Sequence, residues 1–466
     1  MDHFPLTELP YEILLRIVHA VDERDPSPTF PRGPSDSLLS LSAVNRWFSK
    51  ICRPLIFRSV HYVPMATTSP HPAEYRKSRN LESFVKLIKE CEAQGMDPIK
   101  VQQLSIESVE NSFDFDLWYR TSQLDGEEEE EQEQNVIFEL IETLVERGLQ
   151  VLFLKGVLIG GQKAVKFMRA VSNAPRLSAI RFNQVEYGFR DELPLLPKIH
   201  TLQIMHGSPQ LLDLVAKCPN LDSLLLWPSS RRLGPYTPII ESLLPRLRNL
   251  SMDSVRDPST FVQLADEITR LASERYAEPL PLEELFLEGP MTETDRSILV
   301  KSLEHLGNLR RLALYQARNP TPTLFNEIYE SRPNLKSLTV MAGDCDGSVE
   351  WPCPLEEYLP SLSQFKFVEF FASDRRSPEP EEPLRNLVSA FGARQSAIEF
   401  KAFGKLAKAC TSLKEAVAID QDVSEGTSGY FATFKREKGK IRISQKAKTA
   451  CDFLVGYDRW IRVEED

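Results

Sequence analysis

The sequence predicts an α/β fold, in which a small all-helical unit precedes an irregular solenoid of parallel strands and outer helices. Two patterns lead to this prediction. Apolar residues recur at helical spacing within residues 9–60. A short strand-like motif then returns roughly every 22–35 residues from residue 101 onward. The chain has 466 residues, too many for one compact core, so several domains or one elongated array are expected.

Residues 9–60 carry the pattern of two or three short amphipathic helices. Pro10 suits a first helical turn, where its missing N–H costs nothing. Apolar residues in each block lie three or four positions apart and share one helical face: Ile13, Leu14, Ile17, Val18 and Val21, then Leu41, Val44, Phe48, Ile51 and Leu55. The resulting core is very small, and a unit of this size usually needs a partner to cover it.

These two blocks resemble an F-box. The resemblance rests on two blocks in the order of that family: Leu9-Pro10, Glu12 to Leu15, Ile17 and Val21, then Leu38-Leu39, Leu41, Val44, Phe48 and Pro54-Leu55. A proline-bearing insertion at residues 23–36 is longer than the family usually allows. The resemblance implies binding to the Skp-type adaptor of a cullin-RING ubiquitin ligase. It assigns the adaptor contact and the core behind it to Leu9, Pro10, Ile13, Leu14, Ile17, Leu41, Val44 and Phe48, and the sequence does not separate these two roles.

The strand-like motif is an apolar residue, two spacers, an apolar residue, one spacer and an apolar residue. Its first copy is Val101, Leu104 and Ile106, and its last clear copy is Leu362, Phe365 and Phe367. The copies between them begin at Leu149, Leu177, Ile199, Leu221, Leu247, Leu282, Leu309 and Leu335, and a degenerate copy begins at Leu413. Each copy predicts a strand with one buried face.

Helix-start signals separate these strands. Thr321-Pro322 pairs a capping residue with proline at the first helical position, and Thr292 to Asp295 repeats the capping pattern. The strand–turn–helix unit resembles the leucine-rich-repeat family over about residues 101–370. The Asn or Cys that normally follows the strand in that family is mostly missing, so the repeats are expected to be irregular. One repeat cannot bury its apolar face alone, so the array is stable only as a whole.

The predicted domains follow from these segments. Residues 1–62 form the F-box, residues 63–80 a linker, and residues 81–423 the leucine-rich-repeat-like solenoid. The acidic run at residues 125–133 is expected to be a solvated, disordered loop within the solenoid. Residues 424–466 contain two strand-like runs around Lys438-Gly439, which predict a hairpin that caps the last repeat.

Composition and motifs argue against several classes of function. A net charge of −11 argues against a nucleic-acid groove as the main function. No apolar run is long enough to span a bilayer, and the N-terminus lacks the order of a signal peptide. The seven cysteines form no CxxC motif, which predicts reduced thiols in the cytoplasm or nucleus. No phosphate-binding loop, zinc-binding pattern or nucleophile elbow occurs, so neither catalysis, nor a metal, nor a cofactor is expected.

The predicted strands also place large side chains on the solenoid's concave face. The spacer residue and the residue after the third apolar position point away from the core. The substrate-binding candidates at such positions are Met205, Leu225, Trp227, Phe286, Tyr315 and Met341, and a mixed rim comprises Lys155, Arg181, Asp253, Glu288 and Lys366. A contiguous exposed apolar patch usually marks a binding site, but the protein could instead cover these side chains itself.

Together these features predict a non-catalytic substrate-recognition subunit of a Skp–cullin–F-box ubiquitin ligase. Its F-box would bind the adaptor, and its repeats would bind an unknown protein substrate. The alternative is a non-catalytic interaction scaffold with no link to degradation. The sequence identifies neither the substrate nor any dependence on phosphorylation.

Overall fold

The computed structural model describes residues 13–14, 16–18, 36–44, 46–62, 81–93, 100–107, 127–183, 185–188, 193–205, 211–227, 241–253, 259–274, 279–317, 320–340, 355–365, 370–373, 405–406, 408–419, 429–437 and 440–448. The described residues up to Asn220 belong to a first compact unit. Those from Leu221 onward belong to a second. Among all of them, no helix is both long and apolar enough to cross a membrane.

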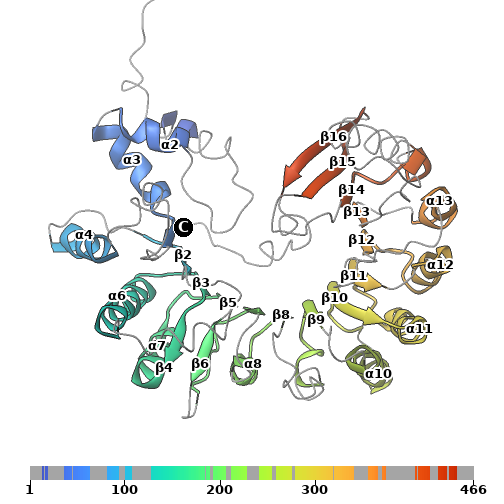
Figure 1. Cartoon of the computed structure of the whole chain (residues 1–466), viewed down its shortest axis with the longest axis horizontal. Helices are drawn as coiled ribbons and strands as arrows, with labels where there is room; N and C mark the ends of the chain where they lie inside the picture. The colour runs from blue at the N-terminus through green and yellow to red at the C-terminus, as the bar shows by residue number, and fades with distance from the viewer. Residues whose placement is uncertain are drawn as a thin grey trace, which may run out of the picture. The chain divides into compact units, whose positions relative to one another are not determined.

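The first unit begins with a group of short helices, here called the front cluster. It comprises the helical residues 13–14 and 16–18, α2 (Asp36–Ser42) and α3 (Arg46–Ile56), drawn in blue in Figure 1. Strand β1 (Ser59–Tyr62) follows α3 almost directly and was not predicted. The Phe57 ring also meets the Phe84 ring of α4 (Leu81–Ala93), with centroids 5.7 Å apart. The front cluster is therefore continuous with the sheet behind it.

The sheet of the first unit is parallel, and helices cover one of its faces (Figure 1). Its strand order follows the sequence: β1, β2 (Gln103–Glu107), β3 (Val151–Lys155), β5 (Ala179–Asn183) and β7 (Thr201–Met205). Short strands β4 (Leu158–Gly160) and β6 (Glu186–Gly188) form a separate pair. The covering helices are α4, α6 (Glu127–Glu146), α7 (Gly161–Asn173) and α8 (Leu212–Lys217).

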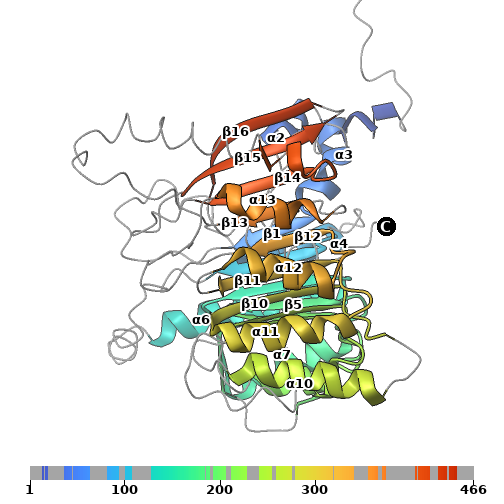
Figure 2. The ribbon, with the colours of Figure 1, turned by 90° about the vertical axis from the view of Figure 1, so that its right-hand side faces the viewer.

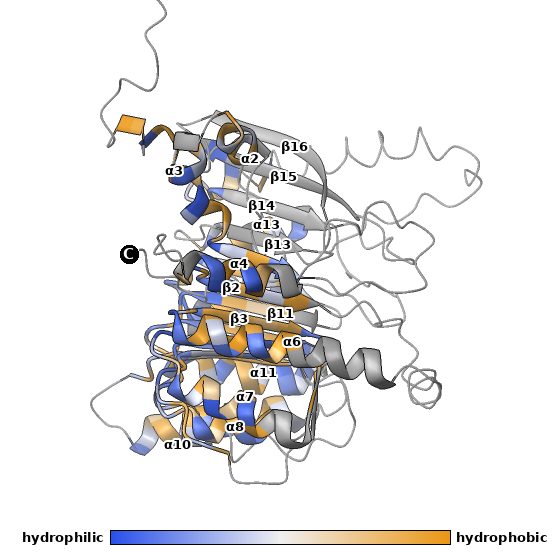
Figure 3. Ribbon diagram, turned by 90° about the vertical axis from the view of Figure 1, so that its left-hand side faces the viewer, coloured by the Kyte–Doolittle hydropathy of each residue, from blue (hydrophilic) through white to orange (hydrophobic). Residues whose placement is uncertain are grey.

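The apolar motif explains which face of each strand packs against the helices. Its second and third apolar residues, such as Leu152 and Leu154 in β3, are buried beneath the helices. The helices show the matching alternation of apolar and polar residues in Figure 3. The residues that alternate with them along each strand, such as Phe153, point to the opposite side of the sheet. We call this side the helix-free face of the unit.

The prediction that the acidic run at residues 125–133 forms a disordered loop is wrong from Glu127 onward. The run forms the first part of α6 instead. Glutamate favours helix, and acidic residues near a helix N-terminus are stabilised by the helix dipole. The apolar period of residues 136–145 continues the same helix, so the charged run did not interrupt it.

Gly148 ends α6 and directs the chain into β3. Its φ is +97°, a left-handed conformation that favours glycine. The Gly148 N–H donates to the Val145 carbonyl at 3.3 Å, and the Leu149 N–H donates to the Leu144 carbonyl at 3.0 Å. These two bonds satisfy carbonyls that the end of the helix would otherwise leave without partners.

The second unit repeats the strand–helix pattern (Figure 2). Seven strands are parallel in sequence order: β8 (Ser223–Trp227), β9 (Asn249–Asp253), β10 (Glu284–Met291), β11 (Arg311–Ala317), β12 (Ser337–Val340), β13 (Phe370–Ser373) and β14 (Glu415–Ile419). The helices that follow β9 to β12 are α10 (Ser259–Glu274), α11 (Glu293–Ser302), continued by the 3₁₀ turn η4 (Leu303–His305), α12 (Pro322–Ser331) and α13 (Leu355–Ser363).

The C-terminal hairpin is confirmed. Strand β15 (Gly429–Glu437) pairs antiparallel with both β14 and β16 (Lys440–Lys448). The degenerate motif at Leu413 is also confirmed as a strand, because Glu415–Ile419 forms β14. Among the described residues, the change to antiparallel pairing occurs at β14, the last of the parallel strands.

The predicted strand at Leu362, Phe365 and Phe367 is wrong. Leu362 lies in α13, Phe365 lies just after it, and both are buried; Phe367 lies outside the described residues. The strand of this repeat is β13, three residues beyond Phe367. A spacing of three between apolar residues fits a helix as well as the first half of the motif, so the short pattern was ambiguous here.

The two predicted helix starts in the second unit differ in detail. Thr292 caps α11, because its hydroxyl accepts a hydrogen bond from the Asp295 N–H at 3.2 Å. Thr321 occupies the same position before α12 but makes no such bond, and Pro322 supplies the preset first turn. Both helices therefore begin where the sequence predicts, α11 through a side-chain cap and α12 through a proline in its first turn.

Candidate functional site

The front cluster has its own small core. Buried side chains from all three helical segments meet there, among them Leu14, Leu38 and Phe48. Val18, Ile51 and Cys52 complete this core, and the partly buried Leu41, Leu55 and Ile56 pack against it. Burial raises the pKa of the Cys52 thiol, as expected for a cysteine that serves as a small apolar core residue.

Three large apolar side chains of the same cluster are exposed to solvent. Ile13 and Leu39 are each 41% exposed, and Val44 is 64% exposed. They come from the first helical segment, from α2 and from the turn that follows α2. These three side chains are the candidate contact residues of the front cluster.

The turn after α2 holds Val44 away from the core. The Ala43 and Val44 N–H groups donate to the carbonyls of Leu39 and Leu41, each at 3.2 Å. The Ser42 hydroxyl also donates to the Leu39 carbonyl at 2.7 Å. The chain therefore leaves the helix through a hydrogen-bonded turn, and α3 begins two residues after Val44.

The structure separates the residues that the F-box resemblance grouped together. Leu14 and Phe48 are core residues, and Leu41 is half-buried against them. Ile13 and Val44 are surface residues, and Ile17 is half-buried. Leu9 and Pro10 lie outside the described residues. Leu39 was missed as a surface candidate, although it belongs to the Leu38-Leu39 pair that supported the resemblance.

The predicted apolar patch on the concave face is not exposed as expected. Leu225 and Phe286 are buried, so neither is available as a surface anchor. Met205 and Trp227 are half-buried, and the Trp227 indole N–H donates to the Ser251 hydroxyl at 3.3 Å. Tyr315 lies in β11, but its side chain is outside the described part, as is all of Met341.

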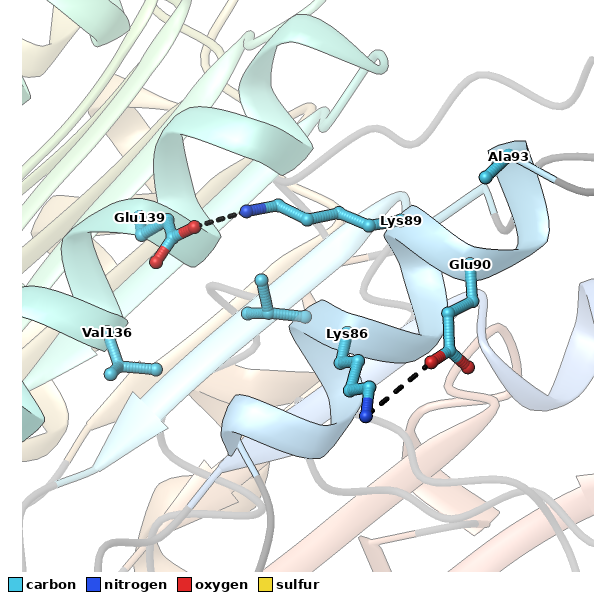
Figure 4. Close-up of a pocket in the computed structure, with 7 residues that line it drawn as sticks. Lys86, Lys89, Glu90, Ala93, Val136 and Glu139 are labelled. Atoms are coloured by element: carbon cyan, nitrogen blue, oxygen red, sulfur yellow. Dashed lines mark hydrogen bonds and ion pairs between the residues drawn. The ribbon is translucent and has the colours of Figure 1, made fainter.

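A groove of about 510 Å³ lies between α4 and α6 (Figure 4). Val85, Ala93 and Val136 line it together with the charged residues Lys86, Lys89, Glu90 and Glu139. Lys86 pairs with Glu90 at 3.7 Å, and Lys89 reaches across to pair with Glu139. Its apolar lining thus has a rim whose charges are compensated, which gives no preference for a charged ligand.

The described residues contain no group of three or more His, Cys, Asp or Glu side chains arranged to hold a metal ion. Their three free cysteines, Cys52, Cys218 and Cys410, are all buried.

Comparison with known proteins adds little to this picture. No protein-family model matches the chain. No curated protein matches it either. Among solved structures, the crystal structure of the Rad7 and Elc1 complex in yeast is similar over 82% of this chain and 92% of that chain, with 13% identity and a TM-score of 0.37.

Proposed function

We propose that the protein is a non-catalytic substrate receptor of a Skp–cullin–F-box ubiquitin ligase. In this proposal the front cluster is an F-box that binds the Skp-type adaptor, and the two strand–helix units hold a protein substrate. The chain would perform no chemistry itself. It would raise the effective concentration of the substrate near a ubiquitin-charged enzyme.

The observation that carries the proposal is the division of the front cluster into core and surface. Ile13 and Val44 belong to the set that the F-box resemblance assigns to the adaptor contact and the core behind it, and both are exposed over a core that includes Leu14 and Phe48. Leu39 adds a third apolar side chain to this exposed set. Burying apolar surface contributes roughly 25 cal/mol per Å², so covering these three side chains favours association.

The position of the cluster also suits a receptor. Helix α3 ends at Ile56 and β1 begins at Ser59, so only two residues separate the cluster from the sheet. The Arg58 carbonyl accepts from the Gln102 and Gln103 N–H groups at 2.9 and 3.0 Å. A short, hydrogen-bonded junction would hold the adaptor and the first repeat unit in a fixed relation, which favours productive transfer.

The test uses the purified full-length chain and a purified Skp-type adaptor. Val44→Asp and Ile13→Asp place a charge on the exposed apolar surface and should each weaken adaptor binding at least tenfold in a titration. Leu195→Asp is the matched control, because Leu195 is 63% exposed and lies in the same unit outside the front cluster. This control should bind like the wild type. Equal binding by all four proteins would refute the proposal.

A scaffold without a link to degradation is the second candidate. It could bind the same adaptor, so adaptor binding alone does not distinguish the two. Partners that co-purify with the chain should accumulate in cells that carry Val44→Asp if the protein is a receptor. Their levels should stay constant if it is a scaffold.

A further inference from the structure

Two cations lie side by side at the edge of the second unit where its strands begin. Arg310 immediately precedes β11, and Lys336 immediately precedes β12, the next strand of the sheet (Figure 2). The Lys336 N–H donates to the Arg310 carbonyl at 2.7 Å, so the two residues occupy matching positions on strands that lie about 4.8 Å apart. Both side chains are exposed, and within the described part of the chain neither takes part in an ion pair or a side-chain hydrogen bond.

A third cation, Arg332, is buried between the turns that lead into the same two strands. Only 8% of this residue is exposed. Its Nη2 donates to the Gly307 carbonyl at 2.8 Å, and its Nε makes no hydrogen bond. Burial lowers the pKa of Arg332, and no acidic side chain opposes this effect. A buried guanidinium without a carboxylate is costly, and its charge adds to the positive potential of the neighbouring pair.

The carboxylates of the adjacent segments leave these three cations uncompensated. Such carboxylates occur at the start of β10 and at the ends of the helical segments, and among the described residues none forms an ion pair with the three cations: Glu283, Glu284, Glu304 and Glu330. Glu284 is instead bound to Arg311 at 2.6 Å, and Glu304 lies 3.5 Å from His305. Like charges on neighbouring strands repel, so an anion between Arg310 and Lys336 would remove a repulsion that the chain itself leaves in place.

We propose that this basic edge, defined by Arg310, Arg332 and Lys336, binds an acidic segment of a partner protein, with one Asp or Glu carboxylate on each exposed cation. Binding requires no adaptor, and only the identification of this partner as the substrate rests on the proposed receptor function. Carboxylates neutralise the two exposed cations one to one, and a carboxylate matches the fork of an arginine in a planar, two-point geometry. A phosphorylated segment is usually held by several arginines, whereas Arg310 is the only exposed arginine of the three residues.

The experiment measures anisotropy of fluorescein-labelled twelve-residue peptides with the full-length chain at physiological salt. One peptide carries four glutamates separated by glycine and serine, and three others replace the glutamates by glutamine, lysine or phosphoserine. The glutamate peptide should bind saturably and at least tenfold more tightly than the glutamine and lysine peptides. The phosphoserine peptide and a labelled oligothymidine of twelve nucleotides should bind no more tightly than the glutamate peptide.

Variants locate the site. Arg310→Ala and Lys336→Ala should each weaken binding of the glutamate peptide severalfold, and the double variant should weaken it at least tenfold. The matched control is the double variant Arg169→Ala, Lys166→Ala, because both residues are exposed on α7 of the first unit and the same two kinds of side chain are lost. This control should stay within twofold of the wild type. Without peptide, Lys336→Gln should leave the thermal unfolding midpoint unchanged or raised, because it removes one of two like charges.

Several results would overturn the proposal: no saturable binding of the glutamate peptide, equal effects of the two double variants, or tenfold tighter binding of the phosphoserine peptide or the oligothymidine. A clearly lowered midpoint for Lys336→Gln would contradict the repulsion between the two cations. Adaptor binding separates this question from the receptor proposal, because the Arg310→Ala, Lys336→Ala protein should bind the adaptor like the wild type. A wild-type chain that binds the glutamate peptide but no adaptor would refute the receptor role and leave the acidic-segment site standing.

Discussion

Val44 and Phe48 lie four residues apart at the junction of α2 and α3, yet 64% of Val44 is exposed and only 3% of Phe48. The two residues therefore have separable roles. Phe48→Ala should destabilise the front cluster by about 3–5 kcal/mol, because it removes a buried ring. Val44→Ala should change its stability by less than about 0.5 kcal/mol. Hydrogen exchange of residues 36–56 in the full-length chain measures both effects. Similar loss of protection in the two variants would contradict this division.

The two capping threonines provide an internal comparison. Thr292→Ala should destabilise the second unit by about 1 kcal/mol, because the hydroxyl that accepts from the Asp295 N–H is lost. Thr321→Ala should have a much smaller effect, because Thr321 makes no side-chain capping bond and Pro322 presets the first turn of α12. Urea unfolding of the two variants measures the difference. Thr292→Ser should keep most of the wild-type stability, and equal losses at the two sites would disprove the assignment.

A side chain at Gly148 should destabilise the first unit. A Cβ atom at this position would lie 3.3 Å from Cδ of Arg176, and the φ of +97° is unfavourable for other residues. Gly148→Ala should therefore destabilise the first unit by about 1–2 kcal/mol. Glu146→Ala, two residues earlier on an exposed helical position, is the control and should be close to neutral. Thermal unfolding of the two proteins would show equal midpoints if the conformation of Gly148 is not required.

Tyr358 of α13 forms a hydrogen bond to Pro320, which lies just before α12. Its hydroxyl donates to the Pro320 carbonyl at 2.7 Å, its ring meets Phe325 edge-on at 5.6 Å, and the side chain is fully buried. Tyr358→Phe leaves the buried carbonyl without this donor and should cost about 1–3 kcal/mol. Tyr358→Ala also removes the ring and should cost more, about 3–5 kcal/mol. Urea denaturation tests the order of the two effects, and a neutral Tyr358→Phe would show that the hydrogen bond is dispensable.

Cys410 should resist alkylation in the native protein. Burial raises the pKa of its thiol to about 11, against a smaller opposing influence of the Arg436 charge. Its Sγ donates to the Leu362 carbonyl at 3.4 Å. Since the thiolate is the reactive form, labelling of Cys410 by iodoacetamide at pH 8 should require unfolding. Mass spectrometry of native and denatured samples measures this, and rapid native labelling would contradict the burial.

The raised pKa of the Cys410 thiol also makes the unfolding free energy depend on pH. The thiol of the unfolded chain, with its ordinary pKa of 9.0, ionises before the folded one. The stabilising contribution is therefore complete below pH 9 and is lost as pH rises towards about 11. Cys410→Ala should make the unfolding free energy less dependent on pH in that window. An unchanged pH dependence would argue against Cys410 as its source.

Most of the strands were predictable because their apolar period is a direct consequence of a sheet with one covered face. Leu152 and Leu154 lie under the helices, as the spacing required. The strand expected at Leu362 failed because three-residue spacing also suits a helix, and the chain continues α13 there. The start of α6 was missed because a run of charge was interpreted as a loop, although glutamate favours helix.

The candidate surface could be predicted only in part. Spacing identified Ile13, Leu14, Val44 and Phe48 as one set, because all of them follow the helical period. Burial depends on how the helical segments cross, which the period does not specify, so the exposed members emerged only from the structure. The concave-face candidates failed for a related reason. Leu225 and Phe286 are on the predicted side of their strands, but that side is covered at their positions.

The central claim is that the front cluster is made to be covered by an adaptor. Hydrogen–deuterium exchange of the full-length chain, with and without a saturating purified Skp-type adaptor, tests it most directly. We predict new protection at residues 13–18 and 36–56, centred on Ile13, Leu39 and Val44, and unchanged exchange around Leu195. Protection elsewhere in the chain, or none at all, would contradict it.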